Sequence, residues 1–232
     1  MEIRYMHRLL AFLFVGLLST AAYSLGLDDL TNKEASGGLK DALIQGASKA
    51  VGKLGVTDGF FGNPEVKIPL PDSMKKVEKT MRMLGMGKQA DDLVLKMNRA
   101  AEAAAPEAKA LLIDSVKKMS VDDAKAILTG GDDAATQYFK KTTSAPMAEK
   151  FLPIVKKATE NVQLAQQYDK FAAMGTQYGL VSKDQANLEQ YITQKALDGV
   201  YLMMADEERA IRKDPVGQTS SLIKKVFGSL IN

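Results

Sequence analysis

Apolar residues recur three or four positions apart along most of the chain, which is the spacing of one buried face of an α-helix. Residues 39–54 show this pattern at Leu39, Ala42, Leu43, Ala47, Ala50, Val51 and Leu54. Residues 188–211 show it at Leu188, Ile192, Val200, Met203 and Ile211. Alanine, lysine, methionine and leucine, which dominate the composition, all favour helix. The pattern predicts an all-α protein, a single multi-helix bundle of about nine helices.

Glycines, prolines and capping residues divide this pattern into separate helices. We expect helices over about 38–54, 72–84, 88–104, 106–119 and 120–129. Ser120 and Asp123 form a capping box at the fifth of these. Asp132 is expected to cap a sixth helix that ends near Thr142, and Pro146 to open a seventh that Pro153 bends or restarts. A long helix follows from Ser182 to about Lys213, and a last one begins near 222.

The longest irregular stretch runs from Gly55 to Pro71 and contains three prolines, which exclude a helix there. Residues 66–68 are the candidate for a minor extended segment. Phe60 and Phe61 are adjacent aromatic residues between glycines. They would contact a partner or a membrane if exposed, or plug the bundle if folded back, and we favour the plug.

The first 24 residues have the layout of a secretory signal peptide. Arg4, His7 and Arg8 form a basic start, and residues 9–18 form an apolar run. Small residues then allow cleavage after Ala22 or after Ser24. A retained anchor is the alternative, but an ordinary span needs about 20 apolar residues. We therefore expect an exported, periplasmic protein with a polar lead-in at 25–37 and a helical domain at 38–232.

Two residue types are missing from the predicted mature chain. Cysteine is absent altogether, and His7, the only histidine, lies in the leader. The mature chain then has no Ser-His-Asp or Cys-His mechanism, no Cys/His zinc site, no disulfide and no lipoprotein anchor. We therefore expect no cofactor. The sequence also assigns no catalytic residue.

The charge of the chain is close to balance. The full chain carries a formal net charge of +3, and cleavage would remove two arginines and one glutamate. No basic block of the kind that neutralises a phosphate backbone is present. We expect no nucleic acid partner and no membrane span after cleavage, whereas the oligomeric state stays open.

Gly130, Gly131, Asp132 and Asp133 form the first candidate site. Two carboxylates after a Gly-Gly turn resemble oxygen ligands for a hard cation, so calcium is the metal to test. Similar aspartate pairs stand near other predicted helix starts, where capping and the helix dipole explain them. We favour capping.

Polar residues within two otherwise apolar helices form the second candidate. Each group shares one helical turn and contains a pair four residues apart on one face. The groups are Asn98, Arg99 and Glu102, and Gln194, Lys195 and Asp198. They would form a buried polar site if they met inside the bundle. A solvated face or a salt-bridge network is the favoured alternative.

The last helix carries an apolar face opposite Lys224 and Lys225. Such a helix lies on a membrane in some proteins. Because every predicted helix here is amphipathic in the same way, we expect it to complete the core instead.

Several long segments resemble one bacterial family. They are NPEVKIPLPDSMKKVEK (63–79), MNRAAEAAAPEAK (97–109), DAKAILTGGDDAATQYFKKTT (123–143), KFLPIVKKAT (150–159), YITQKALDGVYLMMADEE (191–208) and IRKDPVG (211–217). In this order they are similar to the domain-of-unknown-function family numbered four-one-nine-seven, over nearly all of the mature chain. The resemblance implies an exported all-helical bacterial protein and implies no activity.

The expected function is therefore that of a non-enzymatic protein that binds a partner protein or a small ligand. One alternative is a carboxylate- or metal-dependent enzyme that uses Asp132 and Asp133. Another is a peripheral envelope lipid-binding protein that uses the last helix or the Phe60–Phe61 segment.

Overall fold

The structure, a computed structural model, describes residues 32–161, 164–177, 188–215 and 221–228. The predicted leader lies outside these residues. The α-helices are α1 (Asn32–Leu54), α2 (Lys75–Met83), α3 (Gly87–Ala104), α4 (Ala108–Lys118), α5 (Val121–Leu128), α6 (Ala134–Asn161), α7 (Leu164–Gln177), α8 (Leu188–Lys213) and α9 (Ser221–Gly228). Two short 3-10 helices, η2 (Asp72–Met74) and η3 (Ala105–Glu107), precede α2 and α4. The predicted all-α class is confirmed, and the expected count of about nine helices is close.

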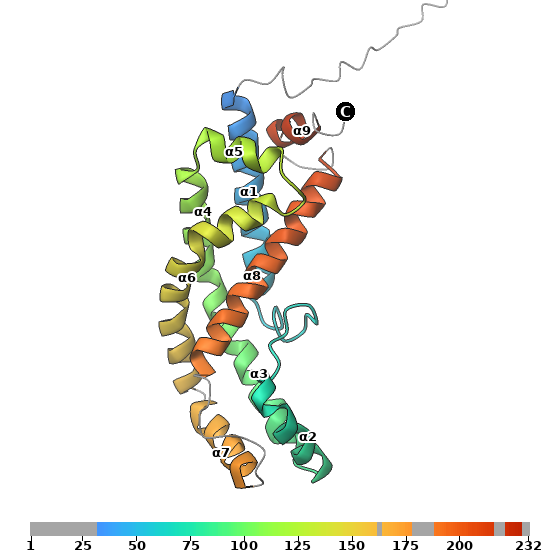
Figure 1. The fold of residues 1–232 in the computed structure, drawn as a ribbon, viewed down its shortest axis with the longest axis vertical. Helices are drawn as coiled ribbons and strands as arrows, with labels where there is room; N and C mark the ends of the chain where they lie inside the picture. The colour runs from blue at the N-terminus through green and yellow to red at the C-terminus, as the bar shows by residue number, and fades with distance from the viewer. Residues whose placement is uncertain (1–31, 162–163, 178–187, 216–220, 229–232) are drawn as a thin grey trace, which may run out of the picture.

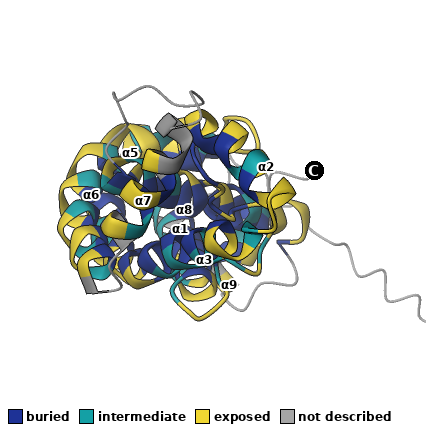
Figure 2. Cartoon of the chain, turned by 90° about the horizontal axis from the view of Figure 1, so that it is seen from below, coloured by how far each residue is buried: buried dark blue, intermediate teal, exposed yellow. Residues whose placement is uncertain are grey.

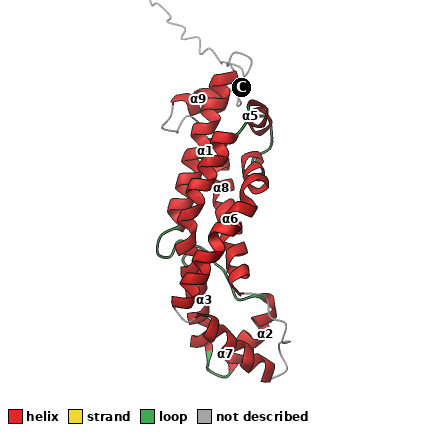
Figure 3. Ribbon diagram, turned by 90° about the vertical axis from the view of Figure 1, so that its left-hand side faces the viewer, coloured by secondary structure: helices red, strands yellow, loops and turns green. Residues whose placement is uncertain are grey.

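The helices form an elongated bundle (Figure 1). Helix α8 crosses the front of α1, and α6 packs along α8 and α3. The start of α1, with α5 and α9, lies at one end of the long axis, whereas α2 and α7 lie at the other (Figures 1 and 3). Figure 2 shows buried residues on the inward faces of the helices and exposed residues around them. The bundle therefore presents two distant ends as well as its sides.

The predicted core stripes of the two long helices are confirmed. All seven apolar residues named on α1 and all five named on α8 are buried. Helix α9 also belongs to the core, because Ile223, Val226 and Phe227 are buried where α9 packs against α1. The apolar face of the last helix is therefore buried and is not available for the lipid binding considered as an alternative.

Helix α6 corrects the expected division at its two prolines. It runs without a break from Ala134 to Asn161, through Pro146 and Pro153. An interior proline costs about 3 kcal/mol because it removes one backbone donor and crowds the preceding turn. Full burial of a large apolar side chain contributes about 1.5–3 kcal/mol. Four such side chains lie along one face of α6 and outweigh the two prolines: Phe139, Met147, Phe151 and Val155.

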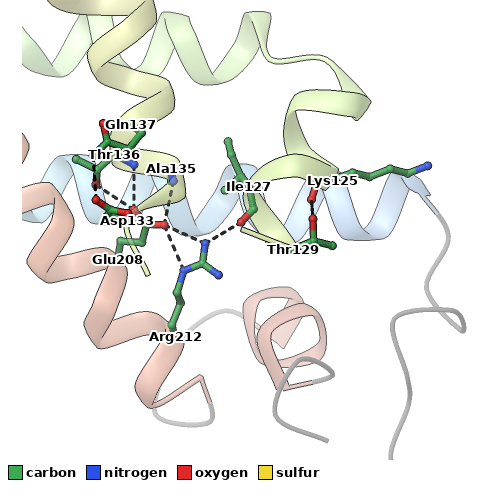
Figure 4. A network of polar contacts seen from close by, with 9 residues as sticks. All are labelled: Lys125, Ile127, Thr129, Asp133, Ala135, Thr136, Gln137, Glu208 and Arg212. Atoms are coloured by element: carbon green, nitrogen blue, oxygen red, sulfur yellow. Dashed lines mark hydrogen bonds and ion pairs between the residues drawn. The ribbon is translucent and has the colours of Figure 1, made fainter. Parts of the chain in front are cut away.

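The start of α6 also differs from the expectation that Asp132 caps it. Glu208 of α8, buried, accepts hydrogen bonds from the backbone N–H of Ala135 (3.0 Å) and Thr136 (2.9 Å) and from the Thr136 hydroxyl (3.0 Å) (Figure 4). Arg212 donates to the same carboxylate at 2.9 Å and to the carbonyl of Ile127 at 2.8 Å. The cap therefore comes from another helix, which ties α5, α6 and α8 together.

Four further sequence expectations concern where helices and strands begin. The capping box at α5 is confirmed, since Ser120 and Asp123 exchange side-chain and backbone hydrogen bonds. Helix α1 begins at Asn32, inside the stretch expected as a polar lead-in. Residues 66–68 form no strand, and none is present in the described parts of the chain. The expected helix start at Ser182 lies outside the described residues.

Candidate functional site

The loop between α1 and α2, residues 55–71, is an ordered element held by buried side chains of α3. Glu102 accepts hydrogen bonds from the backbone N–H groups of Phe60 and Phe61, each at 3.1 Å. Asn98, which is 0% exposed, accepts from the N–H of Ile68 at 2.8 Å and donates to its carbonyl at 2.9 Å. Asn98 thus satisfies both backbone polar groups of Ile68, which lies outside any sheet or helix.

Helix α8 holds the same loop from the other side. Phe60 is 0% exposed, and its ring packs against Gly199, where a Cβ would lie 2.6 Å from the ring Cε1. The Tyr191 hydroxyl donates to the carbonyl of Pro69 at 3.0 Å. Burial raises the pKa of Tyr191 to about 12, with Asp72 adding to the shift. The plug interpretation of Phe60 is confirmed, and it takes Phe60 out of reach of a partner.

A cleft of about 560 Å³ opens where this loop faces α2 and α3. Its walls are Phe61, Pro64, Lys67, Pro69, Leu70, Glu78, Arg82, Asp91 and Val94. The volume lies within the range of small-ligand pockets. The loop supplies the aromatic and proline wall, and α2 and α3 supply the charged one.

The charged groups of the cleft are arranged around Arg82. Its guanidinium bonds Glu78 Oε1 at 2.8 Å and Asp91 Oδ1 at 2.6 Å. The hydrogen bond from Arg82 lowers the pKa of Asp91, and both carboxylates raise the pKa of Arg82. On the opposite wall, Lys67 Nζ lies 3.9 Å from the centre of the Phe61 ring, a cation–π contact. The four charged groups balance, so apolar and stacking surface dominates what the cleft offers.

The lining of the cleft offers groups that can bind a ligand. The hydrogen bond from Arg82 keeps the pKa of Asp91 below its ordinary value, so this carboxylate stays charged near neutral pH. The cleft can hold a ligand by apolar contact, by stacking on Phe61 and by hydrogen bonds to Arg82 and Lys67.

The two predicted polar groups do not meet in the bundle. Asn98 and Glu102 are buried at the loop, and Arg99 bonds Glu102 at 2.6 Å and Asp58 at 2.8 Å. The group on α8 bonds within itself instead. Gln194 Nε2 donates to Asp198 at 3.0 Å, and Lys195 Nζ lies 3.8 Å from the same carboxylate. The first group is a loop anchor and the second a largely solvated face, which corrects the idea of one shared site.

The Gly130–Asp133 segment lies on the surface. Gly130, Gly131, Asp132 and Asp133 are all exposed, and Asp133, just before α6, accepts a hydrogen bond from Gln137 of α6 at 2.9 Å. No group of three or more histidine, cysteine, aspartate or glutamate side chains suited to a metal occurs within the described residues. The structure therefore adds no ligand to the two aspartates that an enzyme or a calcium site would use.

Sequence reasoning did not single out Arg82, Tyr191 or Gly199. The spacing of Glu78 and Arg82 allowed an ion pair on one helix, but the contact with Asp91 of α3 could be seen only in the structure. Gly199 carried the better signal, because an interior glycine weakens a helix unless close packing requires it. The prediction of a partner contact remains open for Phe61, which is half-buried at the cleft wall.

The family match covers residues 29–228 and is to the family described as "Protein of unknown function (DUF4197)". The chain belongs to this family. The predicted resemblance is thereby confirmed, and the DUF4197 match spans every described helix. No curated protein and no solved structure is significantly similar to the chain. DUF4197 membership therefore brings no activity with it, and the site has to be argued from its own geometry. No described helix has the length and apolarity that crossing a bilayer requires.

Proposed function

We propose that the chain is an exported, non-enzymatic binding protein of the bacterial periplasm, and that the cleft beside the 55–71 loop receives a small ligand or a segment of a partner protein. One observation carries the proposal. Two buried polar side chains, Asn98 and Glu102, hold an irregular loop in place, and that loop builds one wall of a cleft of about 560 Å³.

The position of these anchors supports a functional reading of the loop. A buried polar group is costly unless every hydrogen bond is made, so an apolar residue at position 98 or 102 would stabilise a simple bundle more readily. Here the polar atoms serve backbone groups of the loop. Two buried positions of the bundle are thus occupied by polar instead of apolar side chains. These side chains fix a surface that carries Phe61, Pro64 and Pro69.

Export rests on the leader-like residues 1–24 and on the start of the family match at residue 29, which leaves this segment outside the family domain. Mass spectrometry of the chain recovered from a periplasmic extract tests this part. We expect a mature protein that begins at Tyr23 or Leu25. An uncleaved chain confined to the cytoplasm would overturn the export proposal.

Binding is tested by native mass spectrometry of the mature chain, gently purified, against its denatured mass. We expect added mass in the native state that disappears on denaturation. Val94→Trp should remove it, because the indole fills the cleft beside Phe61. Leu152→Trp, in a separate groove between α6 and α8, is the matched control and should keep it. Added mass that survives Val94→Trp, or none in any preparation, contradicts the proposed site.

A further inference from the structure

The turn between α2 and α3 exposes two adjacent large apolar side chains. Met83 is 71% exposed and Leu84 is 57% exposed. The turn lies at the end of the long axis opposite α9 and the start of α1 (Figures 1 and 3). Exposed apolar residues at one tip of an elongated molecule indicate a contact surface more than scattered single residues do.

Local hydrogen bonds hold these side chains outward. Gly85 adopts the left-handed conformation (φ 75°). The N–H of Met86 bonds the carbonyl of Met81 at 2.8 Å, and the N–H of Gly85 bonds that of Arg82 at 3.1 Å. These are the two bonds of a Schellman motif, which ends a helix in a defined turn. Met81 is buried and Met86 packs against the core, so Met83 and Leu84 are left on the outside of a rigid turn.

Three lysines lie on the two helices that flank the apolar pair. Lys76, Lys79 and Met83 are spaced by three and four residues, so they share one face of α2. Lys88 lies in the first turn of α3, four residues after Leu84. All three lysines are exposed.

The carboxylates of η2, α2 and the first turns of α3 are paired with other cations. Asp72 pairs with Lys75, Glu78 and Asp91 pair with Arg82, and Asp92 pairs with Lys96. Among the described residues Lys76, Lys79 and Lys88 have no ion-pair partner, so the segment from η2 to the start of α3 carries an excess of positive charge.

We propose that this tip, Met83 and Leu84 with Lys76, Lys79 and Lys88, docks on an anionic phospholipid bilayer. The shape favours lipid over a protein partner, because the apolar pair stands on a convex helix turn and a bilayer interface deforms to receive it. The lysines supply charge complementarity to anionic headgroups. The docking is peripheral and uses none of the residues that line the cleft proposed above.

Vesicle co-sedimentation of the mature chain tests the docking. We expect the chain to pellet with phosphatidylglycerol vesicles, to remain in solution with phosphatidylcholine vesicles, and to be released by about 0.5 M salt. Met83→Ser with Leu84→Ser should abolish pelleting. The triple change Lys76→Gln, Lys79→Gln and Lys88→Gln should weaken partitioning about 100-fold, at roughly fivefold per lysine.

Matched controls separate this tip from general surface properties. Val121→Ser with Leu202→Ser removes two exposed apolar residues elsewhere. The triple change Lys109→Gln, Lys150→Gln and Lys157→Gln removes the same charge from other exposed positions. Both controls should pellet nearly as the unchanged chain does. Val94→Trp should also leave vesicle binding intact, so that failure of the cleft and failure of the tip are told apart.

Tryptophan fluorescence gives a second readout, since the chain has no tryptophan of its own. Emission of Leu84→Trp should shift to the blue with phosphatidylglycerol vesicles, whereas that of Leu202→Trp should not. Failure of the unchanged chain to bind these vesicles at low salt overturns the proposal, as does equal binding by the Met83→Ser, Leu84→Ser variant. Photo-crosslinking from position 84 to a protein, without vesicle binding, would assign the tip to a protein partner instead.

Discussion

Asn98 and Glu102 lie one turn apart on α3, and both direct their polar atoms at backbone groups of the 55–71 loop. The four-residue spacing predicts that they share a face, but spacing says nothing of what they bond. A polar residue inside an apolar helix has the same sequence signature whether it faces solvent or a buried backbone. The partner distinguishes the two cases, and the partner lies 30 to 42 residues away in the sequence.

Asn98→Leu should lower the free energy of unfolding by about 2–4 kcal/mol, because it leaves the buried N–H and carbonyl of Ile68 without a partner. Chemical denaturation measures the loss. Gln194→Leu, on the solvated face of α8, is the control and should change stability by less than about 0.5 kcal/mol. Equal effects of the two variants would show that Asn98 does not anchor the loop.

Glu208→Ala should cost about 3 kcal/mol of stability, because three donors at the start of α6 and the Arg212 guanidinium lose one buried acceptor. Asp132→Ala removes the exposed carboxylate that the sequence pattern favoured as the cap, and should cost less than about 1 kcal/mol. Thermal unfolding of the two variants side by side decides between them. A larger loss for Asp132→Ala than for Glu208→Ala would show that Asp132 caps α6 after all.

At the scale of the element, α6 and the 55–71 loop show that proline by itself does not decide the structure of a segment. Pro146 and Pro153 lie inside a continuous helix because its buried face outweighs their cost. The prolines of the loop lie in a segment that is irregular but fixed, because α3 and α8 bond and pack against it. Proline therefore constrains the local backbone, and packing against other helices decides the result.

Pro153→Ala should raise the free energy of unfolding by about 1–2 kcal/mol. It restores a helical donor and relieves crowding, and greater freedom of the unfolded chain offsets part of the gain. Pro153 is exposed, so no core contact is lost. Circular dichroism melting checks the rise. A lower melting temperature would mean that the proline itself stabilises the shape of α6.

Gly199→Ala should lower stability by about 1–2 kcal/mol, because the added methyl group meets the Phe60 ring and outweighs the gain in helix propensity. Gly52→Ala is the matched control, since nothing lies within 4 Å of a Cβ at position 52 and that site is exposed. It should raise stability by up to about 1 kcal/mol. Denaturant titrations should show changes of opposite sign in the free energy of unfolding of the two variants. A stabilising Gly199→Ala would show that the Phe60 ring is not packed tightly against α8.

At the scale of the whole molecule, the missing residue types set the response to pH. The described residues contain no histidine or cysteine, so no side chain with an ordinary pKa between about 5 and 8 is present among them. The hydrogen bonds from Arg82 to Asp91 and from Ser120 to Asp123 lower the pKa of each carboxyl group. Burial raises the pKa of Tyr191 to about 12 and also raises that of Tyr168.

The free energy of unfolding should therefore stay nearly constant from about pH 6 to pH 8.5. Below about pH 5 it should fall, because the aspartates of the unfolded chain take up protons before those of the folded chain. Above about pH 10 it should fall again, because unfolded tyrosines ionise before the buried ones. Urea titrations across this range test the profile. A step centred near pH 6.5 would contradict it.

The sequence by itself determined the all-α class, the core stripes of α1 and α8, the capping box of α5 and the family, because each depends on spacing within one segment. Only the tertiary structure decided that Glu208 caps α6, that Asn98 and Glu102 hold a distant loop, and that Arg82 bonds Asp91 of the neighbouring helix in a cleft. The physical reason is range. Helical periodicity and capping act over three or four residues, whereas these contacts join side chains to groups far along the chain or on separate helices that only packing brings together.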